Sequence, residues 1–380
     1  MSHWKICFAV VLTAVLMLLV ITCGSSTNQN EILIGEYSSL TGTTATFGQS
    51  THRGLMMAVQ ETNDSGGVLG KKIKLITEDD QSRPEEAATA VTKLISRDKV
   101  VAVIGEASSS RSLAAAPICQ ANQIPMVSNA STNPEVTRKG DYIFRVCFID
   151  PFQGEVLAKF VFNSLKLKRV AVLKDIKNDY SIGLAQFFEE NFGALGGEVV
   201  AVQAYSEGDA DFKAQLTALK GSEPEAVIVP GYYTEAALIV KQARELNMNM
   251  PFIGGDGWDS GKLVEIGGAA MENTYFSTAY TADDPDPVVQ NFAGKYRSLY
   301  KDIPDAFAAL GYDAGMILFD AIRRAGGTDG AGIRDALVAT RDFRGVTGLI
   351  TIDEDRNARK PIVIITVVNG KLTYKETIQP

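Results

Sequence analysis

The stretch VVAVIGEASSSRSLAAAP, residues 100–117, predicts the order strand, glycine, helix. The small and β-branched apolar residues before Gly105 are typical of a buried strand, and the alanine-rich run is typical of a helix. A helix needs a single N-cap, yet Ser108, Ser109 and Ser110 stand together here. We therefore expect spare hydroxyl and N–H groups that bind a ligand, with surplus capping as the alternative.

The same order of strand and helix recurs on both sides of that stretch. It runs from residue 31 to YIFRV (142–146), pauses at DPFQG (150–154) and restarts at RVAVLKD (169–175). Such alternation indicates βαβ units and a parallel, doubly wound sheet. The restart and the length of 380 residues favour two similar α/β lobes.

Composition and motifs argue against several functions. A net charge of −8 without a basic cluster argues against nucleic acid and against an anionic membrane surface. The only histidines are His3 and His52, so we expect no zinc site, no Ser–His pair and His52 as a solvated or capping residue. A phosphate-binding P-loop motif is absent. We predict a protein that is not an enzyme and needs no cofactor or metal.

The N-terminus has the pattern of an export signal. An uncharged apolar run from Ile6 to Ile21 precedes Cys23 and a polar segment. VITC (20–23) resembles the lipobox of bacterial lipoproteins, although Thr22 replaces the usual small residue. We expect a signal peptide over 1–22, a lipidated Cys23, a tether over 23–30 and a location outside the cytoplasm. An uncleaved anchor or later cleavage are the alternatives.

Two cysteines remain in the part expected to fold, Cys119 and Cys147. In an oxidising compartment they could pair. Each lies in an apolar run, and buried free cysteine is the commoner state at such positions. We predict no disulfide.

Small polar residues follow the expected strands of both lobes. Ligands of open α/β sheets bind beyond the carboxyl ends of the strands, so these segments suggest the two walls of a cleft. The segments are YSSLTG, GEASSS, SNASTN, PGYYT and GGDGWD.

The chemistry of these segments suits a zwitterion. Ser109 lies at one helix N-terminus, and Asn133 is predicted to cap a second helix, so the two ends could bind a carboxylate. Asp256, between glycines, could receive an ammonium group, with a turn-forming role as the alternative. An α-amino acid could thus bridge the lobes.

Nearly the whole expected mature chain resembles the type I periplasmic binding proteins of the branched-chain amino-acid (leucine/isoleucine/valine) class. The resemblance implies two Rossmann-like lobes joined by three hinge segments, which close on a ligand and deliver it to an ABC permease. The matching segments are ILIGEYSSLTGTTATFG, NDSGGVLGKKIKLITEDD, VVAVIGEASSSRS, PMVSNASTNPEVT, YIFRV, DYSIGLAQFF, PGYYTEAALIVKQAR and FIGGDGW.

The resemblance also implies domain boundaries. The N-terminal lobe would comprise 31–149 plus 280–361, and the C-terminal lobe 150–279 plus 362–380. The hinge would bend near Phe148–Pro151, Thr278–Tyr280 and Pro361. We expect a monomer that binds an α-amino acid with a branched-chain or other apolar or aromatic side chain.

The family's binding positions carry over residue by residue. Ser109, Ala130 and Thr132 would hold the α-carboxylate, with Thr132 also near the amino group. Asp256 stands at the position of the ammonium-binding carboxylate. Aromatic positions of the pocket are Tyr232, Phe47 and Tyr180.

The sequence departs from the family at two places. Ser82 and Ser108 stand where a disulfide can occur in branched-chain binders, so that bridge is absent. Ala107 and Ser108 replace larger or more apolar residues of the pocket wall, so the resemblance leaves open whether the ligand is a branched-chain amino acid. A ligand sensor of the same fold that binds an amide, and an exported α/β enzyme, are the competing hypotheses.

Overall fold

The computed structural model describes residues 30–379. The expected signal peptide (1–22), Cys23 and all of the expected tether except its last residue lie outside this range. Within the described range, no helix is long and apolar enough to cross a membrane.

The first half of the described chain forms a five-stranded sheet with the order β2-β1-β3-β4-β5. The pairs β1/β3, β3/β4 and β4/β5 are parallel, as predicted. These strands are β1 (Glu31–Ser38), β2 (Lys72–Asp79), β3 (Ala102–Ile104), β4 (Met126–Ser128) and β5 (Ile143–Arg145). The connecting helices are α2 (Ala45–Asp64), α3 (Pro84–Ser96) and α4 (Ser109–Ala121), with the 3₁₀ turn η1 (Thr137–Lys139).

The second sheet has the order β15-β14-β10-β9-β8-β6-β7. Its strands β6 to β10 pair in parallel, and the last two strands add an antiparallel hairpin. The strands are β6 (Arg169–Asp175), β7 (Glu198–Tyr205), β8 (Ala226–Ile228), β9 (Phe252–Gly254), β10 (Thr274–Thr278), β14 (Ile362–Val368) and β15 (Lys371–Ile378). The helices are α5 (Asp150–Lys159), η2 (Phe160–Ser164), α6 (Asp179–Ala194), α7 (Lys213–Lys220), α8 (Tyr233–Glu245), η3 (Asp256–Trp258), α9 (Gly261–Gly267) and η4 (Gly268–Met271).

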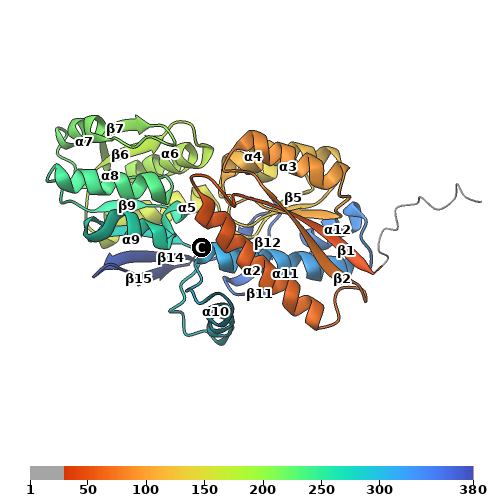
Figure 1. Cartoon of the computed structure of the whole chain (residues 1–380). Coiled ribbons are helices and arrows are strands. Elements are labelled where there is room, and N and C mark those ends of the chain that lie inside the picture. The colour runs from red at the N-terminus through yellow and green to blue at the C-terminus, as the bar shows by residue number, and fades with distance from the viewer. Residues whose placement is uncertain (1–29, 380) are drawn as a thin grey trace, which may run out of the picture. The chain divides into compact units, whose positions relative to one another are not determined.

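Residues between β10 and β14 add three helices and a small sheet. They are α10 (Pro287–Tyr300), α11 (Ala306–Ala325), α12 (Gly330–Val338), β11 (Phe343–Gly345), β12 (Gly348–Ile352) and β13 (Ala358–Arg359). Helix α11 packs against α2, so this late segment lies with the first sheet (Figure 1). The chain therefore returns to the first sheet after β10 and goes back to the second sheet at β14.

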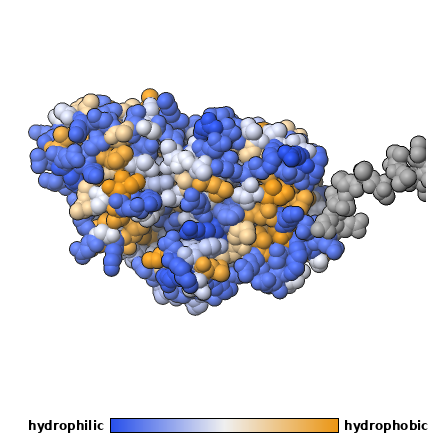
Figure 2. Space-filling model, viewed as in Figure 1, coloured by the Kyte–Doolittle hydropathy of each residue, from blue (hydrophilic) through white to orange (hydrophobic). Residues whose placement is uncertain are grey.

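The short central strands β3 and β8 show why the alternation of strands and helices could be predicted from the sequence. The AVI triplets of β3 and β8 are buried at every residue. Strands covered by helices on both faces are apolar throughout rather than alternating. On the face in Figure 2, polar residues surround several separate hydrophobic patches, so no continuous apolar surface covers this side.

The helix predicted to start at Asn133 is wrong. Asn133 does accept a hydrogen bond from the Glu135 N–H (2.9 Å), as a cap would, but only a turn and η1 follow. Gly140 ends η1 in an extended conformation, and the segment enters β5 three residues later. The predicted α-helix is thus replaced by a turn and a single 3₁₀ turn.

The expectation for His52 is also wrong. Its Nδ1 lies 2.6 Å from the Oε2 of buried Glu36, which also accepts a hydrogen bond from Thr77. This hydrogen bond raises the pKa of His52. His52 is thus partly buried and paired with an acid instead of being solvated or capping a helix.

Candidate functional site

A small cavity collects residues from segments of both sheets. It contains five of the seven predicted ligand-binding residues; the other two, Ser109 and Thr132, are buried beside residues of its wall. The lining residues are Phe47, Ala107, Ala130, Tyr180, Tyr232, Asp256, Gly257 and Phe307.

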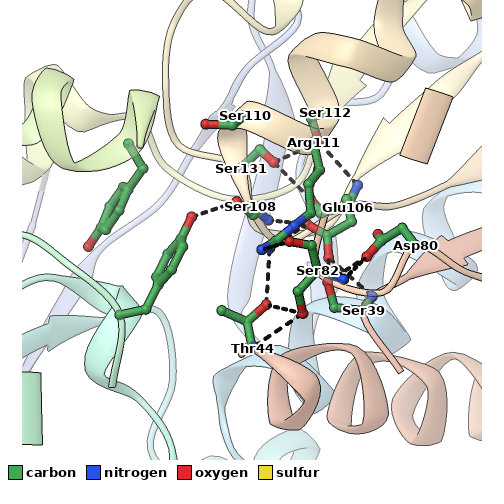
Figure 3. A network of polar contacts seen from close by, with 12 residues as sticks. Ser39, Thr44, Asp80, Ser82, Glu106, Ser108, Ser110, Arg111, Ser112 and Ser131 are labelled. Atoms are coloured by element: carbon green, nitrogen blue, oxygen red, sulfur yellow. Dashed lines mark hydrogen bonds and ion pairs between the residues drawn. The ribbon is translucent and has the colours of Figure 1, made fainter. Parts of the chain in front are cut away.

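The serines at the start of α4 join separate segments of the chain. Ser108 precedes the helix, but its side chain makes no capping hydrogen bond; its hydroxyl shares one with the Tyr232 hydroxyl (2.7 Å). The Ser110 hydroxyl, which points away from the polar cluster in Figure 3, accepts from the Asp179 N–H (3.0 Å). The Ser108 and Ser110 hydroxyls therefore connect the start of α4 to Tyr232 and Asp179, which lie in segments connected to strands of the second sheet.

The loop after β4 brings Ala130 and Thr132 to the same place. Ser109 accepts a hydrogen bond from the Asn133 N–H (3.2 Å), which connects this loop to the start of α4. The Thr132 Oγ1 is buried and has no hydrogen-bond partner among the described residues. The predicted second helix is absent, so α4 offers its N-terminus to an anion here without that second helix. Helices α8 and α6 also begin at or next to residues of the cavity wall, Tyr232 and Tyr180.

Arg145 stabilises the loop after β4, a role that the sequence did not reveal. Its buried guanidinium donates to the carbonyl oxygens of Ser131 and Asn133. A buried arginine that satisfies backbone carbonyls can hold a loop that lacks regular structure. The arginine lies at the end of an apolar strand, and nothing in YIFRV indicated whether its side chain would point into the protein or into solvent.

Asp256 begins η3 at the end of β9, as its place in GGDGWD suggested. Its Oδ1 accepts a hydrogen bond from the Gln153 Nε2 (2.8 Å). Burial raises the pKa of Asp256 to about 6, although hydrogen bonds from Gln153 and Tyr180 act in the opposite direction. No Lys, Arg or His of residues 30–379 forms an ion pair with this carboxylate, so a cationic ligand group would stabilise it.

Aromatic rings form the rest of the wall. Phe47 stacks on Phe307, with ring centroids 4.0 Å apart, and meets Tyr232 edge-on at 5.5 Å. Tyr180 stacks on Tyr232 at 5.5 Å, and its hydroxyl accepts a hydrogen bond from the Gly257 N–H (3.2 Å). Such a wall suits an apolar side chain between two polar ends.

A buried acidic network lies behind α4 (Figure 3). Ser39 donates to Glu106 (2.8 Å) or to Asp80 (2.7 Å), and Glu106 accepts from the Ser108 N–H. Burial and the nearby Glu106 raise the pKa of Asp80 to about 8. The network holds the first turn of α4 in place. It was missed because isolated acids in a sequence resemble caps or turns.

Arg111 and Glu207 add a polar connection between segments of the two sheets. Arg111 donates to the Thr44 Oγ1 (3.0 Å) and the Ser82 carbonyl (2.8 Å). It also pairs with the buried Glu106 (3.8 Å) and with the Glu207 carboxylate (3.4 Å). Glu207 follows β7 and also accepts from the Thr43 hydroxyl (2.8 Å). We call these contacts of Glu207 the Glu207 bridge.

The described residues contain no group of three metal-ligating side chains that could hold a metal ion. Cys119 and Cys147 are buried and unpaired, as predicted. The cavity has an acidic side at Asp256, a helix N-terminus at α4 and an aromatic wall. This arrangement is one that can hold a small zwitterion with an apolar side chain.

Comparison with known proteins gives concordant matches. A sequence model of the family described as periplasmic binding protein matches residues 31–371. The Leu/Ile/Val-binding protein BraC3 of Rhizobium johnstonii is 33% identical over 328 residues, which cover 85% of this chain and 88% of that protein.

Solved structures match over nearly the same range. A leucine binding protein, LivK, of Thermotoga maritima is 41% identical with a TM-score of 0.88, covering 92% of this chain and 99% of that one. The branched-chain amino-acid transporter substrate binding protein LivJ of Streptococcus pneumoniae, solved with isoleucine, is 36% identical with a TM-score of 0.88, covering 92% and 100%.

Proposed function

This chain belongs to the type I periplasmic binding proteins of the branched-chain amino-acid class, and we propose that it captures an α-amino acid with an apolar or aromatic side chain. The predicted α/β fold with two lobes is confirmed by the matches to solved structures. The proteins of this class bind solutes and are not enzymes, which agrees with the lack of a recognisable catalytic motif in the sequence.

One observation carries the proposal. The cavity holds a buried carboxylate, Asp256, that has no cation of the described chain paired with it, and the N-terminus of α4 lies among residues of the cavity wall. We assign the α-ammonium group to Asp256 and the α-carboxylate to Ser109, Ala130 and Thr132. Both ends of a zwitterion then find opposite charge or dipole.

The side chain of the ligand would lie among Phe47, Tyr180 and Tyr232. Ala107 and Phe307 extend the same wall.

Capture would proceed by hinge closure of two lobes, 31–149 plus 280–361 and 150–279 plus 362–380. The chain leaves the second sheet after β10, packs with the first sheet and rejoins the second sheet at β14, which supports these boundaries. The hinge would comprise Phe148–Pro151, Thr278–Tyr280 and Pro361. The closed protein, as a monomer, would deliver the amino acid to the permease of an ABC importer.

The protein would work outside the cytoplasm, as its family does, tethered through a lipidated Cys23. Fatty-acid labelling that is lost in Cys23→Ala would support the lipid anchor, and equal labelling of both proteins would refute it. Cys23→Ala should also release the protein from the membrane, because stable anchoring needs more than one acyl chain and the variant carries none at this position.

The second candidate is a sensor of the same fold that binds a neutral amide. Asp256 disfavours it, because a neutral ligand would leave the buried carboxylate without a cation. The exported enzyme is disfavoured by the lack of a recognisable catalytic motif in the sequence.

The test is identification of the ligand. Mass spectrometry of small molecules released from the purified protein, followed by calorimetric titration with the twenty amino acids and their amides, should find an apolar or aromatic L-amino acid. Tight binding of an amide with no binding of the matching amino acid would overturn the proposal.

A further inference from the structure

Asp150 is a buried acid next to the amino-group site that has no assigned role. It is the first residue of α5, its side chain is fully buried, and neither carboxylate oxygen has a hydrogen-bond partner among the described residues. Its backbone N–H donates to the Thr132 carbonyl (2.9 Å), so it adjoins the loop that carries a proposed ligand contact.

The surroundings of Asp150 are rich in acceptors. The Gln153 Oε1 is also buried without a partner, and Gln153 uses its Nε2 to hold Asp256 (2.8 Å). The Thr132 hydroxyl beside them is a donor, and it lowers the pKa of Asp150. A cluster of unpartnered buried oxygens is costly unless a donor or a proton occupies it. The cluster therefore needs a cation or a proton to offset this cost when no ligand is bound.

The chain itself does not supply that cation. Within residues 30–379, no Lys, Arg or His forms an ion pair with Asp150 or Asp256. Arg145 faces Asp150 from β5, but its guanidinium donates to the carbonyl oxygens of Ser131 and Asn133. Two carboxylates near each other without a cation cannot both stay charged at low cost.

The pKa shifts of Asp150 and the groups around it agree with a buried pair of carboxylates that lacks a cation. Burial, with the charge of Asp256, raises the pKa of Asp150 to about 8, while the Thr132 hydroxyl and Arg145 act in the opposite direction. Burial also raises the pKa of the Cys147 thiol to about 12 and that of the Tyr180 hydroxyl well above its usual value. Those two groups therefore stay neutral at physiological pH, and the groups that titrate are carboxyls. Burial raises the pKa of Asp256 and of the neighbouring Asp259 to about 6, so Asp150 is the one still protonated at neutral pH.

We propose that Asp150 and Asp256 form a two-carboxylate site that holds one proton when the cavity is empty and loses it to solvent when the ammonium group of the ligand enters. The proposal rests on the proposed function, because it needs a cationic group on the ligand. The O–H bond of the Asp150 carboxyl breaks, its proton leaves to the buffer, and the ammonium group remains protonated.

Two consequences follow for ligand choice and for pH. A ligand without an ammonium group cannot replace the proton, so the site selects against carboxylic acids that lack an amino group. Ligand affinity should rise with pH between about pH 6 and pH 8, by up to tenfold per pH unit while a full proton is released.

The first test is calorimetry of the full mature chain with L-leucine as probe, in two buffers of different ionisation enthalpy. We expect the wild type to release close to one proton at neutral pH and to bind at least tenfold more tightly at pH 8 than at pH 6. In Asp150→Asn, binding persists through Asp256, proton release disappears and the affinity changes less than about twofold over that range. Asp283→Asn, an exposed acid away from the cavity, is the matched control and should behave as the wild type.

A second measurement needs no variant. Infrared difference spectra of the wild type, with and without ligand, should show loss of the C=O stretch of a protonated carboxyl group, shifted when aspartate is labelled with ¹³C. L-leucine binding without proton release, or with equal release in Asp150→Asn, would overturn the inference alone. Failure of every amino acid to bind at any pH would instead overturn the proposed function, and the inference with it.

Discussion

Two effects compete at Asp256, the residue proposed to bind the amino group. Burial raises its pKa to about 6, while Gln153 and Tyr180 stabilise the ionised form. The carboxylate is thus ionised at neutral pH but has no cation of the described chain to balance it. An ammonium group that enters a site of this kind gains a charged partner which is already oriented by Gln153.

Asp256→Ala should therefore abolish measurable binding of the amino acid. Removal of one member of a buried charge pair costs about 2–5 kcal/mol, which corresponds to a loss of affinity of about thirtyfold to several thousandfold. Calorimetric titration measures it, and Asp283→Ala is the control. Unchanged affinity in Asp256→Ala would remove this residue from the site.

Single residues differ in how well the sequence could predict them. Phe47, Ala130 and Asp256 were predicted to lie at one site, and they line the same cavity. The family resemblance indicated all three positions, and polar strand ends also indicated Ala130 and Asp256. Asp150 and Glu207 were not, because an acid before a proline or in a turn has the same local pattern whether or not it is buried. Their roles depend on distant segments, such as the Thr132 loop and Arg111, that no local pattern specifies.

Among the elements, helices α2 and α11 cross at close range. A Cβ built at Gly54 would lie 1.8 Å from the Ala308 carbonyl oxygen, and one at Gly311 would lie 2.5 Å from the Thr51 carbonyl oxygen. Because these neighbours are backbone atoms, no side chain can move aside to make room. The two glycines allow the helices to approach closely.

Gly54→Ala should lower the free energy of unfolding by about 1–3 kcal/mol, the usual cost of overpacking. Gly294→Ala in α10 is the matched control, because a Cβ there meets nothing within 4 Å. The control should raise stability by about 0.5–1 kcal/mol through its better helix propensity. Urea unfolding measures both, and a Gly54→Ala protein as stable as the control would contradict the close approach.

Elements were predicted best where packing and local pattern agree. The apolar triplets of β3 and β8 are buried on both faces, so their pattern was sufficient. The segment after Asn133 has the residues of a helix start, but the early return into β5 and the hydrogen bonds of Arg145 override that signal. Tertiary contacts of this kind are not encoded in a window of a few residues.

At the scale of the whole molecule, the Glu207 bridge connects the loop after β7 with Thr43 and Arg111 near the first sheet. The Glu207 side chain is only partly buried, at 27% exposure, so water weakens its ion pair with Arg111. The bridge should therefore make a modest contribution to closure. It lies outside the residues proposed to touch the ligand.

Glu207→Gln should speed dissociation of the amino acid by about two- to tenfold, with a smaller effect on association. Stopped-flow fluorescence measures both rates, and Glu223→Gln, exposed in the same half of the molecule, is the control. Scattering of the liganded variant should show a slightly larger radius than the wild type. Equal dissociation rates in both variants would mean that the bridge does not stabilise the closed state.

Stability of the ligand-free protein should fall as pH rises from about 5 to 8. Burial raises the pKa of Asp150 and Asp80 to about 8 and that of Asp305 to about 7. These values lie above that of an unfolded aspartate, about 3.9, so the folded state binds more protons in this range. Each such group lowers the free energy of unfolding by up to about 1.4 kcal/mol per pH unit.

Calorimetric melting across this pH range checks the prediction. L-leucine should flatten the dependence, because its ammonium group keeps Asp150 and Asp256 ionised. Asp150→Asn should flatten it without ligand. A melting temperature that rises steadily towards pH 8 in the ligand-free wild type would contradict the raised pKa values of these acids.

The two buried cysteines have a consequence for biogenesis. Burial raises the pKa of both thiols, Cys119 and Cys147, to about 12, so almost no reactive thiolate forms at neutral pH. The described chain contains no disulfide, so packing, hydrogen bonds and ion pairs stabilise it without a cross-link. Export from a reducing to an oxidising compartment therefore changes no bond in it, and its maturation requires no thiol oxidase or disulfide isomerase.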